Sequence, residues 1–149
     1  MFKHILVPTD GSALSLRAAK IAVALARAHK ARITAIHVMA PFVPPTGGDG
    51  LIYYPDNFSP QEYKKAVEKE AAKALGKVGA AAKSGKVPFD SMAVTDDQPW
   101  EAIVGTAKRK RCDLVVMASH GRRGIAGLLI GSETSKVLTH SRTPVLVCR

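Results

Sequence analysis

The chain has 149 residues, of which 46% are hydrophobic and 23% charged, a composition that excludes disordered and fibrous classes. Its net charge of +10 favours anionic partners, although lysines on solvent-exposed helix faces would give the same balance. The longest nearly uncharged stretch contains prolines, a Gly-Gly pair and Asp49, so we expect no membrane-spanning helix and no membrane partner. The length favours a single domain over residues 1–149.

The N-terminal sequence MFKHILVPTDG is typical of a first strand and not of a signal peptide, because its apolar run is short and no cleavage site follows. We therefore expect a cytoplasmic protein. Cys112 and Cys148 lie in apolar strand-like runs and are expected to be reduced and buried. The histidines are scattered without metal-ligand spacing, which argues against a metal site built by the protein alone.

Residues 2–39 have the pattern strand, helix, strand. Apolar β-forming residues 2–7 end at a turn in which Asp10 or Ser12 can cap a helix. Apolar residues then recur every three or four positions from Leu14 to Ala28, and residues 31–39 have the composition of a second buried strand. This βαβ pattern predicts parallel strands.

Residues 40–57 are rich in proline and glycine and are expected to form a long loop able to cover a ligand pocket. Ser59 to Glu62 (SPQE) form a capping box with proline at the first helical position, which predicts a helix ending near Gly79 or Gly85. Residues 87–95 alternate as in a third strand.

The C-terminal part continues the alternation. Residues 96–99 (DDQP) are expected to cap a short helix, which closes at residues 108–111 (KRKR), where positive charge suits the helix dipole. A strand at 113–117, a helix at 132–139 and a strand at 143–148 follow. The chain is therefore predicted to be an α/β protein. We expect a doubly wound open sheet of five parallel strands in the order 3-2-1-4-5, with helices on both faces.

Three strand ends should converge on one crevice of this sheet. The first strand ends in residues 8–11 (PTDG), the second at Val38-Met39, and the fourth at residues 117–121 (MASHG). They offer a carboxylate, an apolar wall and a glycine loop leading to a helix N-terminus, which suit the sugar, base and phosphates of a purine nucleotide. Gly121 and Gly131 allow positive φ and close approach to an oxyanion, and Ser132 can donate a hydroxyl and an amide.

The sequence resembles the universal stress protein family essentially from end to end. The resemblance rests on the opening ILVPTDGS, the HVM at the end of the second strand, the final TPVLVC and a glycine pattern between them. Nucleotide-binding members of that family carry GxxG, nine residues, and then G(S/T). Gly121, Gly131 and Ser132 match this signature, whereas Ala118 occupies the position of its first glycine.

This resemblance implies a stress-response regulator that binds ATP or a related adenine nucleotide, with Mg²⁺ or Mn²⁺ bridging the phosphates. It implies a homodimer formed through the last strand, at Val145, Leu146, Val147 and Cys148. It places Pro8, Thr9 and Asp10 beside the adenosine, the Val38 backbone at the adenine edge, and Met117 and Ala118 on the pocket floor. The phosphates would meet Gly121, Gly131, Ser132 and the backbone amides of Glu133 and Thr134. His120 is interpreted as a loop residue beside the phosphates, and Arg122 is a candidate for a cover over them.

Ala118 directly follows a strand, so it is expected to be extended, and its methyl group then only crowds the pocket slightly. A left-handed conformation would instead strain it by about 1 kcal/mol or more. Arg122 and Arg123 are candidates for a mobile cover over the phosphates, or for two solvated loop residues.

Ser119 and His120 are one candidate for a nucleophile and its base. Adjacent strand-end residues are expected to point in different directions, and no third orienting group is evident, so we do not expect triad-type catalysis. No general base for attack on a γ-phosphate is evident either, which predicts at most slow ATP hydrolysis. His37 is expected to be a core or interface histidine.

Three other interpretations stay open. The chain has the features expected of a family member that binds no nucleotide and acts through protein contacts, or of a phosphotransferase or nucleotidase that uses ATP. Charge alone also permits non-specific nucleic-acid binding. Aromatic residues make up only 5% of the chain and form no evident stacking platform, so nucleic acid is not an expected partner.

Overall fold

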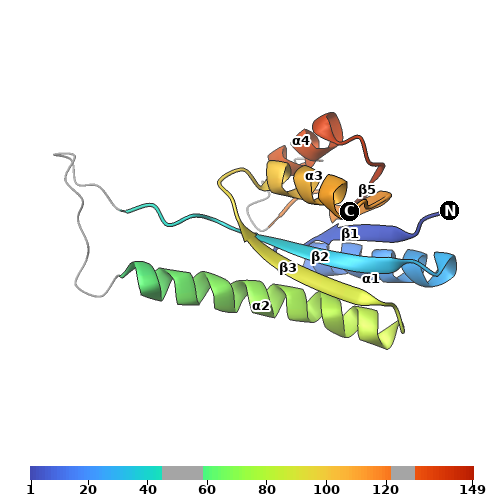
Figure 1. The fold of residues 1–149 in the computed structure, drawn as a ribbon, viewed down its shortest axis with the longest axis horizontal. Helices are drawn as coiled ribbons and strands as arrows, with labels where there is room; N and C mark the ends of the chain where they lie inside the picture. The colour runs from blue at the N-terminus through green and yellow to red at the C-terminus, as the bar shows by residue number, and fades with distance from the viewer. Residues whose placement is uncertain (45–58, 122–129) are drawn as a thin grey trace.

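The computed structural model describes residues 1–44, 59–121 and 130–149. In these ranges, the strands form one parallel sheet in the order β3-β2-β1-β4-β5, with helices on both faces (Figure 1). The predicted class and strand order are therefore confirmed. The strands are β1 (His4–Pro8), β2 (Arg32–Met39), β3 (Phe89–Thr95), β4 (Leu114–Ala118) and β5 (Val145–Cys148), and the helices are α1 (Ala13–His29), α2 (Pro60–Ser84), α3 (Pro99–Arg109) and α4 (Ser132–His140).

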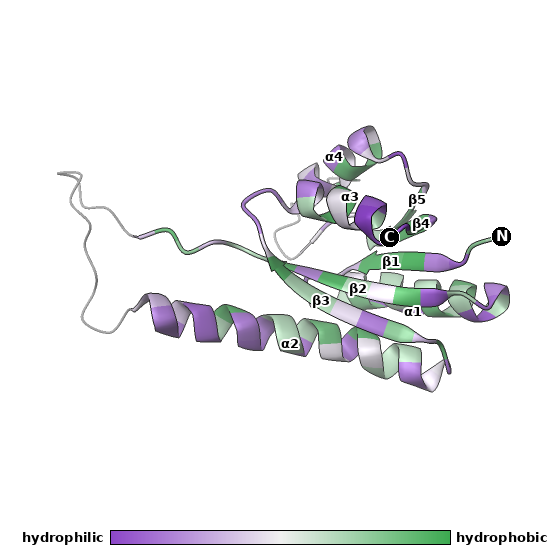
Figure 2. Cartoon of the chain, viewed as in Figure 1, coloured by the Kyte–Doolittle hydropathy of each residue, from purple (hydrophilic) through white to green (hydrophobic). Residues whose placement is uncertain are grey.

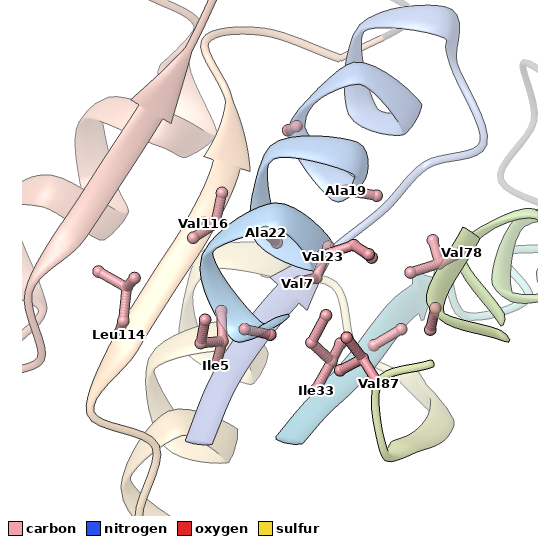
Figure 3. Packing of buried hydrophobic residues seen from close by; sticks show 14 of the residues in the cluster. Ile5, Val7, Ala19, Ala22, Val23, Ile33, Val78, Val87, Leu114 and Val116 are labelled. Carbon is pink, nitrogen blue, oxygen red and sulfur yellow. The ribbon is translucent and has the colours of Figure 1, made fainter. Parts of the chain in front are cut away.

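Helices α1 and α2 cover one face of the sheet, and α3 and α4 cover the other. Successive side chains of a strand point to opposite faces, so the residues of β1 are shared between two cores. Ile5 and Val7 pack with Val23 of α1 and Val78 of α2 (Figure 3), whereas Leu6 belongs to the core beneath α3 and α4. Every residue of β1 is buried, as expected for a parallel strand covered on both faces.

The hydropathy of each element follows its place in the fold (Figure 2). Most of β1 is hydrophobic, whereas hydrophobic and hydrophilic residues alternate along α2, which packs against the sheet on one side only. Both cysteines, Cys112 and Cys148, are free and buried, as predicted. Burial raises the pKa of the Cys112 thiol to about 11. No helix in the described ranges is both long enough and apolar enough to span a membrane.

Two of the predicted helix starts are confirmed by their capping bonds. Ser12 Oγ accepts from the Ser15 amide at 3.1 Å, and Ser59 forms a reciprocal capping box with Glu62 at the start of α2. The third cap differs from the prediction. Gln98 is the N-cap of α3 but makes no side-chain cap bond, and Asp96 Oδ1 instead accepts from the Gln98 amide.

Three helix-to-strand turns share one backbone motif. Their basic residues Lys30, Lys86 and Arg111 have φ values of 55°, 55° and 54°, in the left-handed region that usually favours glycine. In each turn the next residue is buried and donates its amide to the carbonyl five positions earlier: Ala31 to Ala26 at 2.8 Å, Val87 to Ala82 at 3.0 Å, and Cys112 to Ala107 at 2.8 Å. The turns precede β2, β3 and β4 and therefore lie at the amino end of the sheet.

Candidate functional site

A pocket of about 230 Å³ lies at the carboxyl ends of β1, β2 and β4. The strand order reverses between β1 and β4, and open α/β sheets bind ligands at such a reversal. Most of the predicted site residues line this pocket: Pro8, Thr9, Asp10, Val38, Met117, Ala118, His120, Gly121, Glu133 and Thr134. The sheet thus brings together residues from both halves of the sequence.

The other predicted site residues lie at its border or outside the described ranges. Gly131 packs against His120, whose Cα would be 3.2 Å from a Cβ atom at position 131. Ser132 is exposed as the first residue of α4. Arg122 and Arg123 lie outside the described residues, as does most of the loop at 40–57, so the predictions of a cover over the pocket stay predictions.

The β1–α1 loop presents Asp10 to the pocket. Asp10 Oδ1 accepts from the Ser12 amide at 3.0 Å, and the Thr9 hydroxyl accepts from the Gly11 amide at 3.2 Å. Gly11 has φ of 78°, a left-handed value that a side chain would strain. The loop is therefore held by its own side chains in a turn that requires glycine at this position.

The end of β4 and the start of α4 are joined by hydrogen bonds. Thr134 Oγ1 donates to the Ala118 carbonyl at 3.0 Å, and the Gly131 amide donates to the Ser119 carbonyl at 2.7 Å. Gly131 is the N-cap of α4 and has no side chain to accept from the first-turn amides. These amides and the positive end of the helix dipole adjoin the pocket, an arrangement that favours an anion.

Ala118 is the last residue of β4 and pairs in register with Cys148. The prediction that it is extended is confirmed, and it is absent from the left-handed residues of the described chain. Its backbone is thus unstrained where the related signature has glycine. The methyl group faces a packed environment, because Ala118 is 8% exposed.

The predicted reason for the two site glycines is only half right. Neither Gly121 nor Gly131 has a left-handed φ, and Gly131 has φ of −73° with ψ of 160°. Close approach does explain them. A Cβ atom at position 121 would lie 2.8 Å from Asp10 Oδ2, so glycine lets the β4 loop reach the carboxylate of the β1 loop.

The prediction that Ser119 and His120 point in different directions is wrong. Ser119 Oγ and His120 Nδ1 are hydrogen-bonded at 3.2 Å, because the chain bends as it leaves β4. Ser119 is nevertheless 1% exposed. Its hydroxyl is therefore a buried structural partner of His120 and is not presented to a substrate.

The prediction that the backbone amide of Glu133 meets the phosphates stays a prediction, and the structure gives the Glu133 side chain a separate role. Its side chain turns to α3, where Oε2 accepts from the Trp100 amide at 2.9 Å, while Oε1 pairs with Lys136 Nζ at 3.3 Å. Glu133 thereby supplies the helix cap that Gln98 does not provide. No sequence signal links residues 33 positions apart on two separate helices.

Sequence reasoning missed several lining residues: Ser15, Ile36, His37, Pro99 and Ile103. The strand period identifies Ile36, which lies two residues before Val38 on the same face. His37 is a satisfied buried histidine, as predicted, and its Nδ1 donates to the Thr9 carbonyl at 2.9 Å. The prediction did not place it at the pocket.

Fold and site together define a doubly wound α/β protein with a ligand pocket at the reversal of strand order. The sequence matches the universal stress protein family over residues 1–149, and the chain belongs to that family. Universal stress protein MJ0531 of Methanocaldococcus jannaschii is 34% identical over 151 aligned residues, which cover 100% of this chain and 83% of that protein.

Two solved structures show the same fold over nearly the whole chain. Hypothetical protein MJ0577 of the same organism has a TM-score of 0.80 at 25% identity, covering 99% of this chain and 96% of that one. A universal stress protein in complex with cAMP has a TM-score of 0.73 at 26% identity, covering 99% and 97% of the two chains.

Proposed function

We propose that this chain binds an adenine nucleotide, ATP or a close relative, and acts as a cytoplasmic stress-response regulator. One observation carries the proposal. The pocket at the reversal of strand order adjoins the start of α4, whose first-turn amides receive no side-chain cap. Such a helix start favours phosphate. A universal stress protein of the same fold was solved with cAMP, which supports an adenine ligand here.

The remaining walls suit a nucleoside. Ile36, Val38, Ile103 and Met117 give an apolar surface for a base. The pairing of β2 with β1 ends at Ile36, so the Val38 backbone beyond it can hydrogen-bond the edge of the base. Asp10 lines the same pocket and offers carboxylate oxygens to donor groups. The phosphates would then meet the amides of Ser132 to Thr134.

A divalent ion would be held at this site by the phosphates of the nucleotide and not by a cage of protein side chains alone. Within the described ranges, no three His, Cys, Asp or Glu side chains gather closely enough to form a metal cage. Mg²⁺ is commonly held by substrate phosphates with one or two carboxylates, and Asp10 and Glu133 both line the pocket. The ion would neutralise phosphate charge, while the protein contributes amides and shape.

Hydrolysis is proposed to be slow at most. The Glu133 carboxylate is engaged by the Trp100 amide and Lys136, and His120 Nδ1 is engaged by Ser119. Because two protein donors already hold the Glu133 carboxylate, it is not presented as a general base for water.

We also propose a single domain over residues 1–149 and a homodimer through β5. Among the described strands, β5 is at the edge of the sheet and pairs with β4 alone. Leu146 on this strand is 38% exposed. An apolar edge strand of this kind is protected when it pairs with a second copy.

The phosphate site can be tested with Ser132→Pro. Proline is favoured at the first position of a helix, and the ψ of 160° at Gly131 suits the residue before proline. The variant therefore removes both the amide and hydroxyl donors while keeping α4. Isothermal titration should show ATP affinity reduced by about tenfold or more. Ser132→Ala, which keeps the amide, should lose less.

The wild-type protein tests the proposal most directly. Protein purified without added nucleotide should release an adenine nucleotide on denaturation, detectable by chromatography, or bind ATP in titration. Absence of both would overturn the proposal and favour a member that acts through protein contacts. Steady phosphate release in the presence of a defined acceptor would point to a phosphotransferase.

A further inference from the structure

The peptide group between Gly11 and Ser12 is held at both of its ends. Its N–H donates to Asp10 Oδ1 at 3.0 Å, and its C=O accepts from Lys77 Nζ at 3.0 Å. A peptide group is planar and rigid, so the two bonds fix one orientation together. An ammonium ion at the carbonyl also polarises the N–H toward the carboxylate.

We propose that Lys77 is a positioning residue for Asp10, acting across the Gly11–Ser12 peptide group. Lys77 belongs to α2 and lies 66 residues away from Gly11 in the sequence. It fixes the direction in which the Asp10 carboxylate faces the pocket, and so sets affinity for ligands with hydrogen-bond donors on the nucleoside. This inference rests on the proposed nucleotide site.

The backbone around Lys77 is well placed for this task. Its neighbours Ala74 and Val78 are 2% and 0% exposed, and Val78 belongs to the core shared by α1 and α2, so the start of the lysine side chain is fixed. At the other end, the left-handed φ of Gly11 sets the direction of the carbonyl that the ammonium group meets.

A second anchor lies on the other side of Asp10. The buried His37 ring donates to the Thr9 carbonyl at 2.9 Å, and the Thr9 amide donates to the Ile36 carbonyl at 2.9 Å. Residue 9 is therefore tied to β2, whereas residue 11 is tied to α2. Asp10 lies between two carbonyls that side chains from different elements hold in place.

Lys73 provides a matched control. It lies one turn before Lys77 on α2, is exposed, and makes no hydrogen bond to a described residue. Replacing either lysine by methionine removes one positive charge and keeps an unbranched side chain. Any general effect of charge on nucleotide binding should therefore be similar in the two variants.

The test measures ATP affinity by titration in single and double variants. Lys77→Met should weaken binding by about three- to tenfold, with Lys73→Met within about twofold of wild type and Lys77→Arg restoring most of the loss. In an Asp10→Ala background, Lys77→Met should have no further effect, because the residue it positions is absent. Equal losses in both backgrounds would overturn the proposal.

A readout without ligand separates this inference from the proposed function. In the nuclear magnetic resonance spectrum of the ligand-free protein, the Ser12 amide signal should move in Lys77→Met and stay in Lys73→Met. If the wild type binds no nucleotide but this signal moves, the proposed function fails while the link from Lys77 to the Asp10 loop stands. An unmoved Ser12 signal overturns the link itself.

Discussion

Glu133 of α4 accepts a hydrogen bond from the backbone amide of Trp100 in the first turn of α3, at 2.9 Å. This bond joins two helices on the same face of the sheet at the end that borders the pocket. The ring of Trp100 also packs on His140, with centroids 4.5 Å apart. The start of α3 therefore depends on a side chain that arrives from α4.

Glu133→Ala should lower the free energy of unfolding by about 1 kcal/mol, the usual cost of losing a helix N-cap. Glu133→Gln keeps an acceptor oxygen and should lose less. Urea denaturation followed by the fluorescence of Trp100, the single tryptophan, measures both. Lys136→Ala removes only the exposed ion pair and should cost less than about 0.5 kcal/mol. An equal cost in the alanine variants at 133 and 136 would contradict the cap.

Ala118→Gly should change ATP affinity by less than about threefold, or about 0.6 kcal/mol. The reason is that Ala118 is already extended, so glycine relieves no backbone strain. The variant should instead lose about 0.5–1 kcal/mol of stability, because glycine is more flexible in the unfolded chain. Titration and urea denaturation on the same preparation check both. A large gain in affinity would mean that the methyl group obstructs the ligand.

Two glycines near the C-terminal half of α2 should respond to alanine in opposite directions. A Cβ atom at Gly76 meets nothing within 4 Å, so Gly76→Ala should stabilise the helix by up to about 1 kcal/mol. At Gly85 the same atom would clash with Val23 Cγ1, in a tightly packed core. Gly85→Ala should therefore cost about 1–3 kcal/mol. Thermal unfolding of the two variants measures both effects, as shifts of the midpoint temperature in opposite directions. Shifts of the same sign would contradict this packing.

His4 is a buried histidine at the amino end of the sheet, 4% exposed. Its Nδ1 donates to the Lys110 carbonyl at 3.1 Å, and its Nε2 accepts from the Thr34 hydroxyl at 2.8 Å, which describes the neutral ring. Burial lowers the pKa of His4 below its ordinary 6.5, and the nearby Arg32 charge lowers it further.

The free energy of unfolding should therefore decrease at acidic pH because of the protonation of His4. The unfolded chain takes up the proton at about pH 6.5, whereas the folded chain takes it up only at lower pH. The contribution of the neutral ring is complete above pH 6.5 and declines as pH falls from there through the folded-state pKa. Urea denaturation between pH 7.5 and 5 should show a steeper decline for wild type than for His4→Gln. Parallel curves would rule out His4 as the titrating group.

The sequence predicted the fold well because apolar periodicity is a local property. The five strands and four helices of the described ranges lie within a few residues of their predicted bounds. The meeting of Asp10 with Gly121 followed as well, since the carboxyl ends of parallel strands share one edge of a sheet. Those inferences needed only the pattern of each element and the rule of parallel connection.

The sequence did not predict contacts that depend on how separate elements pack. Nothing in the sequence distinguishes Lys77 from the other lysines on solvent-exposed helix faces, and the capping bond from Glu133 to α3 has no local signal. The left-handed turns were also not predicted, for a different reason. Glycine is the usual residue there, and Lys30 and Arg111 give no hint of that conformation.

Those three turns have a consequence for how the protein can be altered. Replacing Lys30, Lys86 and Arg111 by glycine relieves a cost of about 1 kcal/mol at each position and changes the net charge from +10 to +7 by removing three positive charges. All three are at the amino end of the sheet, whereas the pocket is at the carboxyl end. Thermal stability and net charge can therefore be engineered at the amino end of the sheet without changing any residue that lines the pocket at the carboxyl end.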